Sequence, residues 1–130
     1  MRTQNYSRKR QAIYELLLST KEHPSAEWIY NNLKSDFPDL SLGTVYRNLK
    51  LLEKNGAVRS VAVVDGRERY DALMSRHSHF VCIHCGRVID VMMDRIAEEV
   101  TEESEIDGIG TVEFLSLIYY GTCEKCRSLN

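Results

Sequence analysis

The stretch D-A-L-M-S-R-H-S-H-F-V-C-I-H-C-G-R-V-I-D, residues 71–90, gathers histidine, cysteine and aspartate within twenty positions. It holds a His-x-His pair, a Cys-x-x-Cys pair and an aspartate at each end. Thiolates suit zinc, whereas imidazoles and carboxylates suit iron, manganese or zinc. A second Cys-x-x-Cys pair lies near the C-terminus, at residues 123–126. The stretch therefore predicts two chemically different metal sites.

The two Cys-x-x-Cys pairs are the more specific signal. Four thiolates can close a tetrahedral structural zinc site that ties the end of the last strand to a hairpin turn. Two disulfides or a thiol redox pair are the alternatives, but a redox pair normally opens a helix beside a βαβ unit, and no such pattern is visible. The sequence contains no apolar run near eighteen residues and no signal-peptide pattern, so we expect a cytoplasmic protein with reduced cysteines. The predicted zinc ligands are Cys82, Cys85, Cys123 and Cys126.

The His-x-His pair lies on a predicted strand over residues 77–82. Alternation places His77 and His79 on one face, with α-carbons roughly 7 Å apart. If the following hairpin is centred near residue 84, Asp90 falls opposite Ser78 or His79. A carboxylate would then stand beside two imidazoles, although a polar strand exposed to solvent is the plainer alternative.

The first half of the chain predicts three helices followed by a hairpin. Apolar residues recur at helical spacing, serines stand at the N-cap positions, and Gly56 stands at a C-cap position. The expected helices are 7–20 after Ser7 as N-cap, 26–33 after Ser25, and 42–55 after Ser41. A β-branched run over 57–64, the turn Asp65-Gly66 and residues 67–72 then predict a hairpin. This order describes a winged helix, a helix-turn-helix variant whose third helix enters the DNA major groove.

Charge is distributed unevenly along the chain. Residues 1–76 hold 13 Lys and Arg against 9 Asp and Glu, whereas residues 77–130 hold 4 against 10. A mildly basic first half can face phosphate, and Arg47 is the best base reader because its fork can bond guanine bidentately. Solvated face residues on an ordinary helix are the alternative. The predicted DNA-contacting residues are Ser41, Thr44, Tyr46, Arg47 and Lys50, with Arg67 and Arg69 of the wing as backbone contacts.

The second half predicts a small α/β unit, so the fold class is α+β. We expect an acidic helix over 94–105 and a strand over 111–120 that is apolar on both faces, typical of a buried strand or a subunit interface. The predicted domains are a winged-helix domain over 1–72, a hinge over 73–76 and a metal-binding dimerisation domain over 77–130. No nucleophile stands beside an obvious base, so the chain does not look like an enzyme.

The combined order of a winged helix, R-Y-D, H-S-H-F-V-C-I-H-C-G, V-I-D and Y-Y-G-T-C-E-K-C resembles the ferric uptake regulator (Fur) superfamily of bacterial metal-dependent repressors. The resemblance covers nearly the whole chain. It implies a homodimer, a structural Cys₄ zinc, and binding to double-stranded operator DNA when a regulatory metal is present. It also implies the regulatory ligands, which are His23, Asp71, His77, His79 and Asp90. An ion held by all five would lock the two domains together and favour the DNA-binding dimer.

Aspartate in V-I-D resembles the peroxide-responsive regulator (PerR) branch of that family. In that branch, bound Fe²⁺ reacts with hydrogen peroxide and oxidises ligand histidines, here His23 and His77, which releases DNA. A manganese-loaded form would repress but resist peroxide. A further sensory site of other branches is expected to be absent, because its positions hold Arg76 and Ser78.

The chain departs from the family at its beginning. It lacks most of the helix that usually precedes the winged helix, and Y-S-R-K-R stands where T-P-Q-R is usual. Three alternatives stay open: a repressor of metal uptake genes that responds to iron, zinc or manganese; a zinc enzyme using His77, His79 and Asp90; and a zinc-stapled interaction module without a DNA role.

Overall fold

The structure is a computed structural model of the chain and describes residues 2–72, 78–92, 105–112 and 116–129. Side chains of the first helix are described from Arg8 onward. The chain divides into two compact units, Met1–Met74 and Ser75–Asn130, which are taken one at a time below. The predicted hinge, residues 73–76, lies outside the described residues.

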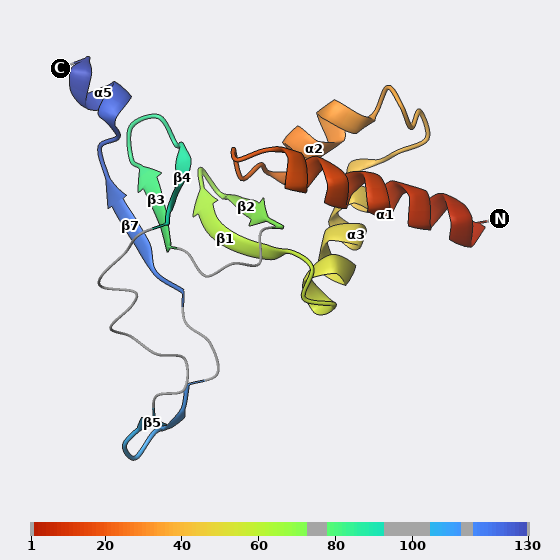
Figure 1. Cartoon of the computed structure of the whole chain (residues 1–130). Coiled ribbons are helices and arrows are strands. Elements are labelled where there is room, and N and C mark those ends of the chain that lie inside the picture. The colour runs from red at the N-terminus through yellow and green to blue at the C-terminus, as the bar shows by residue number, and fades with distance from the viewer. Residues whose placement is uncertain (1, 73–77, 93–104, 113–115, 130) are drawn as a thin grey trace. The chain divides into compact units, whose positions relative to one another are not determined.

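Three helices build the first unit (Figure 1). They are α1 (Arg2–Ser19), α2 (Ala26–Leu33) and α3 (Leu42–Lys54). The prediction that Ser7 caps the first helix is wrong, because α1 begins five residues earlier, at Arg2. The segment before Ser7 contains no proline or glycine, so nothing in it stops a helix from extending upstream.

The other two helix starts are confirmed by their caps. Ser25 Oγ accepts a hydrogen bond from the Trp28 amide at 3.3 Å, and Ser41 Oγ accepts one from the Thr44 amide at 3.1 Å. Each bond satisfies an amide that has no partner within its own helix. At the other end of α3, Gly56 has a φ of 77°, the left-handed conformation expected just past a helix C-terminus.

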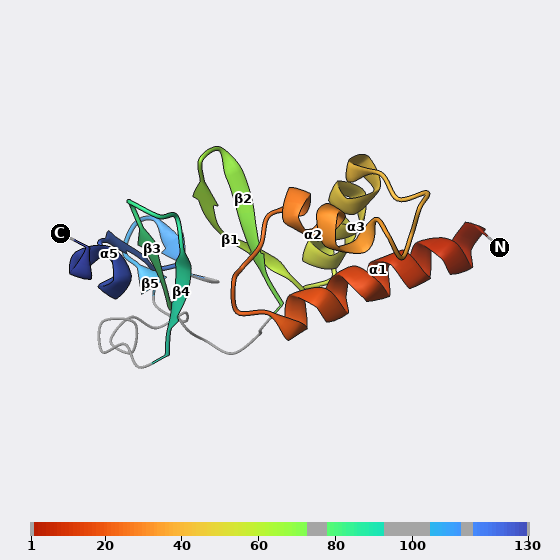
Figure 2. The same ribbon diagram turned by 90° about the horizontal axis from the view of Figure 1, so that it is seen from above.

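The core of the first unit lies where the three helices meet (Figure 2). Ile13 of α1, Ile29 of α2 and Val45 and Leu49 of α3 are fully shielded from solvent. Burial of such side chains contributes about 1.5–3 kcal/mol each relative to exposure. This core fixes α3, the predicted recognition helix, against the other two.

A hairpin completes the first unit as a wing. Strands β1 (Arg59–Val64) and β2 (Arg67–Asp71) are antiparallel, with an irregularity between Ser60 and Ala62. Asp65 and Gly66 both have positive φ, 52° and 76°, as a two-residue hairpin turn requires. The three helices and this hairpin form the predicted winged helix.

The second unit contains a three-stranded sheet of order β4-β3-β7. The central strand β3 (Ser78–Cys82) pairs antiparallel with β4 (Val88–Val91) and parallel with β7 (Ile118–Gly121). The register sets His79 opposite Asp90, which is one of the two partners predicted from the sequence. It also sets Cys82 opposite Gly121, so β3 and β7 end side by side.

Two predictions for the second unit are corrected. The expected continuous strand over 111–120 is wrong: Gly110–Thr111 forms β6, residues 116–117 are not strand, and β7 begins at Ile118. Strand β6 pairs instead with β5 (Glu105–Ile106) across a turn with Gly108 at a φ of 75°. The acidic helix predicted over 94–105 falls outside the described residues except at Glu105, which is in β5.

A short helix, α5 (Glu124–Ser128), closes the described chain and was not predicted from the sequence. This helix has no buried residue, so the sequence contains no apolar periodicity from which it could be predicted. None of the described helices is long and apolar enough to cross a membrane.

Candidate functional site

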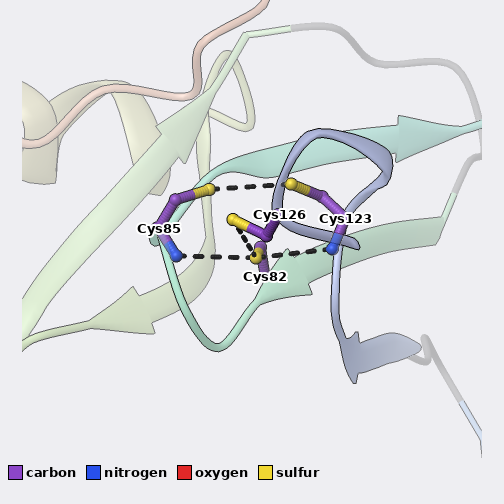
Figure 3. Close-up of side chains that lie close together, drawn as sticks. All are labelled: Cys82, Cys85, Cys123 and Cys126. Carbon is purple, nitrogen blue, oxygen red and sulfur yellow. Dashed lines mark hydrogen bonds between the residues drawn. The ribbon is translucent and has the colours of Figure 1, made fainter. Parts of the chain in front are cut away.

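Four cysteines from two distant segments meet at one end of the three-stranded sheet (Figure 3). Cys82 is the last residue of β3, and Cys85 follows in the turn toward β4. Cys123 is the N-cap residue of α5, and Cys126 lies inside that helix. The parallel pairing of β3 with β7 brings the two Cys-x-x-Cys pairs together, because both strands end at the same edge.

The sulfur atoms have the spacing of metal ligands. Sγ of Cys82 lies 3.7 Å from Sγ of Cys126, and Sγ of Cys85 lies 3.8 Å from Sγ of Cys123. All four sulfurs lie within 4.8 Å of one another. Four sulfurs placed tetrahedrally about 2.3 Å from a zinc ion are about 3.8 Å apart. A disulfide needs about 2.05 Å, so the four cysteines are free thiols and are spaced for a shared ion.

Backbone amides favour the thiolate form at this cluster. The amides of Cys123 and Cys85 donate to Sγ of Cys82 at 3.4 and 3.5 Å, and these hydrogen bonds lower the pKa of the Cys82 thiol to about 5. The hydrogen bond from the Cys126 amide likewise lowers the pKa of Cys123. The hydrogen bond with the Cys123 side chain, together with burial, raises the pKa of the Cys126 thiol to about 12. Metal binding requires thiolates, so a bound soft divalent cation would displace the remaining protons, and the donor set fits such a metal.

His84 does not belong to this cluster. Its side chain is exposed and its Nε2 lies 3.0 Å from the hydroxyl of Thr122.

A histidine–aspartate pair lies in the same sheet. Nε2 of His79 is 3.4 Å from Oδ1 of Asp90, the residue opposite it on β4. Two ligand atoms held about 2.1 Å from one ion are about 3.0–3.4 Å apart. The pair therefore has the spacing of two ligands to one ion. His77, the other histidine of the His-x-His pair, lies outside the described residues.

The first unit holds a second histidine–aspartate pair. Nδ1 of His23, in the loop between α1 and α2, is 3.7 Å from Oδ2 of Asp71, the last residue of β2. Both side chains are buried. The loop and the strand are 48 positions apart in sequence, so only the fold brings them together.

Hydrogen bonds between β2 and the loop place His23 beside Asp71. The Arg69 guanidinium donates to the carbonyl oxygen of His23 and, at 2.7 Å, to that of Glu22. The amide of Tyr70 donates to the carbonyl of Pro24 at 3.0 Å. His23 itself has a φ of 49°, a left-handed conformation that is costly outside glycine and persists where surrounding bonds enforce it.

This geometry changes the interpretation of Arg69. The sequence suggested a wing residue that contacts the DNA backbone, but the guanidinium is half-buried and turned toward the loop at residues 22–23. Burial lowers the pKa of Arg69, although the group stays charged because its ordinary pKa is so high. The missed signal was strand alternation, since Arg69 and Asp71 share one face of β2.

The predicted DNA-contacting residues of α3 divide into two groups. Tyr46, Arg47 and Lys50 are exposed, as is the cap residue Ser41. Thr44 is buried, although the sequence predicted it as a DNA-contacting residue. Its hydroxyl lies 2.9 Å from Ser41 Oγ and accepts a hydrogen bond from the Arg47 guanidinium at 3.0 Å. Thr44 therefore braces Arg47 and the start of α3.

Comparison with known proteins places these features in one family. The Ferric uptake regulator family matches residues 2–119. The chain is 33% identical over 118 residues to the peroxide operon regulator of Bacillus subtilis, which covers 91% of this chain and 81% of that protein. It is 31% identical to the peroxide-responsive repressor PerR of Staphylococcus aureus, over 92% of this chain and 80% of that protein.

Solved structures agree with the sequence comparison. The peroxide stress regulator of Campylobacter jejuni has a TM-score of 0.79 and 31% identity, covering 94% of this chain and 91% of that one. The ferric uptake regulator of Helicobacter pylori, described as having three functional metal-binding sites, has a TM-score of 0.75 and 25% identity, over 92% and 80%. The winged helix, the four-cysteine cluster and the two histidine–aspartate pairs thus belong to a transcriptional regulator, not an enzyme, and the chain is a member of the Ferric uptake regulator family.

Proposed function

We propose that this chain is a dimeric, metal-dependent repressor that binds operator DNA and senses hydrogen peroxide through oxidation of ligand histidines. The observation that supports it most directly is the pairing of His79 with Asp90 across β3 and β4. Aspartate has a shorter side chain than glutamate, so its carboxylate oxygens can reach fewer positions. The pairing of Asp90 with His79 therefore sets where these oxygens lie. The likeness to two peroxide regulators supports the same assignment.

The cysteine cluster would hold a structural zinc ion. Cys82, Cys85, Cys123 and Cys126 would supply four thiolates, and the sulfur spacing fits a tetrahedral ion. No coordination position would stay open for substrate or water, which is the mark of a structural site. Zinc would then fasten α5 and the end of β7 to the β3–β4 turn.

The regulatory metal would be Fe²⁺ or Mn²⁺, held by His23, Asp71, His77, His79 and Asp90. When bound, Fe²⁺ would supply the reaction with hydrogen peroxide that adds oxygen to a ligand imidazole, whereas Mn²⁺ would supply binding alone. Ligands from both units would then bind one ion, and its binding would favour one arrangement of the units over others. An oxidised His23 or His77 would be a poorer metal ligand. Once that ligand is lost, the metal would no longer favour the DNA-binding arrangement of the units.

The DNA-binding half would use α3 and the wing. Arg47 and Lys50 are exposed on α3 and suit the major groove, while Arg67 is exposed on the wing and suits phosphate. Dimerisation would involve the second unit, whose edge strand β7 leaves Tyr120 62% exposed. A dimer would present two copies of α3 to two operator half-sites.

The decisive experiment compares two metals before and after peroxide. The protein is purified without oxygen, loaded with Fe²⁺ or Mn²⁺, and titrated against DNA from upstream of its own gene. We expect both forms to bind, and peroxide to abolish binding of the iron form only, with a mass increase of about 16 Da (one added oxygen) on His23 or His77. An iron form that keeps binding DNA without this modification would leave an iron-, zinc- or manganese-responsive repressor as the better assignment.

Asp90→Glu tests the residue that carries the proposal. The longer side chain keeps the charge but moves the carboxylate by one methylene, so metal-dependent DNA binding should persist while the peroxide response weakens. Asp107→Glu, in the turn between β5 and β6, is the matched control and should respond as the unaltered protein does. Equal peroxide sensitivity of all three proteins would show that Asp90 does not set the response.

A further inference from the structure

Three elements of the winged helix meet at the carboxylate of Glu27. Glu27 lies in the first turn of α2, Tyr46 on α3 and Arg67 at the start of β2. The Tyr46 hydroxyl donates a hydrogen bond to Oε1 of Glu27 at 2.9 Å. On the other side of the carboxylate, Nε of Arg67 is 3.9 Å from Oε2. One acidic group therefore touches the recognition helix and faces the wing.

The second oxygen of this carboxylate is poorly satisfied. Oε2 of Glu27 is shielded from solvent and has no hydrogen-bond partner in the described part of the chain. Arg67 at 3.9 Å is too far for a hydrogen bond, and its side chain is 63% exposed. A buried acceptor without a hydrogen-bond donor destabilises the fold. Arg67 is therefore the cationic side chain to which Oε2 is attracted.

Glu27 carries its charge at neutral pH. Burial acts to raise the pKa of Glu27, but hydrogen bonds from its own backbone amide and from Tyr46, together with the charge of Arg67, outweigh burial and lower the pKa below its ordinary value. The N-terminal position in α2 also favours an anion. A permanent negative charge thus lies beside two groups predicted to approach DNA phosphates.

We propose that Glu27 is a specificity-determining residue, which holds Tyr46 in place on α3 and keeps Arg67 from neutralising phosphate on arbitrary DNA. This proposal rests on the proposed DNA-binding function. Non-specific affinity depends almost entirely on phosphate neutralisation, whereas specific affinity adds base contacts. A carboxylate that holds Arg67 away from phosphate therefore lowers non-specific binding, whereas the operator complex still has its base contacts.

Glu27→Gln separates the two roles of the side chain. Glutamine keeps an oxygen that can accept from Tyr46 but removes the charge that engages Arg67. We expect non-specific binding to rise roughly twofold to fivefold, the range of one exposed ion pair. The plot of log affinity against log salt should steepen by about 0.9, the slope of one added phosphate contact. Glu15→Gln on α1, whose described hydrogen bond is with Gln11, is the charge-matched control and should change neither quantity.

A double-mutant cycle with Arg67→Gln identifies the partner. In the protein with Glu27, Arg67→Gln should weaken non-specific binding less than it does in the Glu27→Gln background, because Glu27 partly offsets the charge of Arg67. With Glu27→Gln, the same substitution should abolish the added affinity and restore the original salt slope. Equal losses from Arg67→Gln in both backgrounds would overturn the proposal, as would an unchanged salt slope in Glu27→Gln.

The Tyr46 contact is tested in the free protein, which separates this proposal from the proposed function. The hydrogen bond to Glu27 raises the pKa of the Tyr46 phenol. The unaltered protein and Glu27→Gln are each titrated by ultraviolet absorbance with and without Tyr46→Phe, and the difference gives the titration of the Tyr46 phenol. Glu27→Gln should lower the pKa of that phenol. An unchanged pKa would show that Tyr46 does not contact Glu27. If the Mn²⁺-loaded protein binds no promoter DNA although this titration behaves as expected, the proposed function fails and the specificity role fails with it.

Discussion

At the scale of residues, His23 depends on groups far from it in sequence. Its left-handed backbone is fixed by the Arg69 guanidinium and by the hydrogen bond between Tyr70 and Pro24. Its imidazole meets Asp71 only because β2 runs alongside the loop. From sequence alone, a histidine before a proline is an ordinary loop residue, and only the family resemblance singled it out. No local pattern encodes a ligand that tertiary hydrogen bonds hold in place.

The position of Arg69 leads to a prediction about metal affinity. Arg69→Gln removes the charged fork that holds the carbonyls of Glu22 and His23, so the His23 ring should lose its fixed place. We expect Mn²⁺ affinity to fall roughly tenfold to 100-fold, as for other groups that orient a ligand. Calorimetric titration with Mn²⁺ measures this. Arg67→Gln, two residues along the same strand, should retain the affinity of the unaltered protein, and an equal loss in both variants would contradict the assigned role.

Gly121 gives a prediction about stability. A Cβ at this position would lie 3.1 and 3.3 Å from two ring atoms of Phe80, on the neighbouring strand β3. The ring has to move, so Gly121→Ala should lower the free energy of unfolding by about 1–3 kcal/mol, a cost typical of overpacking. Gly43→Ala, where the nearest atom is the mobile Arg47 guanidinium at 3.4 Å, should be neutral or stabilising by up to about 1 kcal/mol. Denaturant unfolding of the two variants compares them directly.

At the scale of elements, local patterns predicted local structure well. Ser25, Ser41 and the Asp65-Gly66 turn each act through neighbours within four residues, and each prediction was confirmed. The β3–β4 register could also be predicted, because the position of the turn sets which residues of a hairpin face each other. The parallel pairing of β3 with β7 could not be predicted, since it joins residues about forty positions apart and no sequence pattern marks it. The split between β6 and β7 was missed for a related reason: an apolar run does not reveal where its partner strand changes.

A salt bridge between elements yields a prediction about pH. Lys9 of α1 contacts Asp39, in the loop before α3, at 3.0 Å, and this hydrogen bond lowers the pKa of Asp39 below its ordinary value. A group whose pKa is lower in the folded state contributes stability above its unfolded pKa and loses it as pH falls through its folded pKa. Asp39→Asn should therefore be less stable than the unaltered protein at pH 7, and the gap should close below about pH 4. Thermal unfolding at both pH values measures the gap, and a gap that does not depend on pH would exclude this contribution.

At the scale of the whole molecule, the two units have different sources of stability. The first has a core of fully buried aliphatic residues from three helices. The second has short strands, and its described sheet ends at the cysteine cluster. Small units with little apolar core usually need a metal or a disulfide to fold. We therefore expect packing to stabilise the first unit and metal binding by the four cysteines to stabilise the second.

Cys126→Ser tests this division. Removing one of four thiolates should release the structural zinc and unfold the second unit, while the helical circular dichroism of the first unit persists. Zinc content and sensitivity to proteolysis within residues 75–130 would report the loss. His84→Ala changes a residue between two ligands but outside the cluster, and it should keep its zinc. Loss of the helical signal in Cys126→Ser would mean that the first unit cannot fold without the second.

Strand β3 links the two proposed metal sites. It ends in Cys82 and carries His79 three positions earlier, so one strand serves both proposed metals. Its partner β7 is synthesised about forty residues later, and the cysteines beyond each strand close that long loop. Zinc would thus be acquired only after Cys123 and Cys126 have been made. In a cell short of zinc, newly made chains would stall at that step, and the response to peroxide would weaken through the supply of a metal that takes no part in sensing.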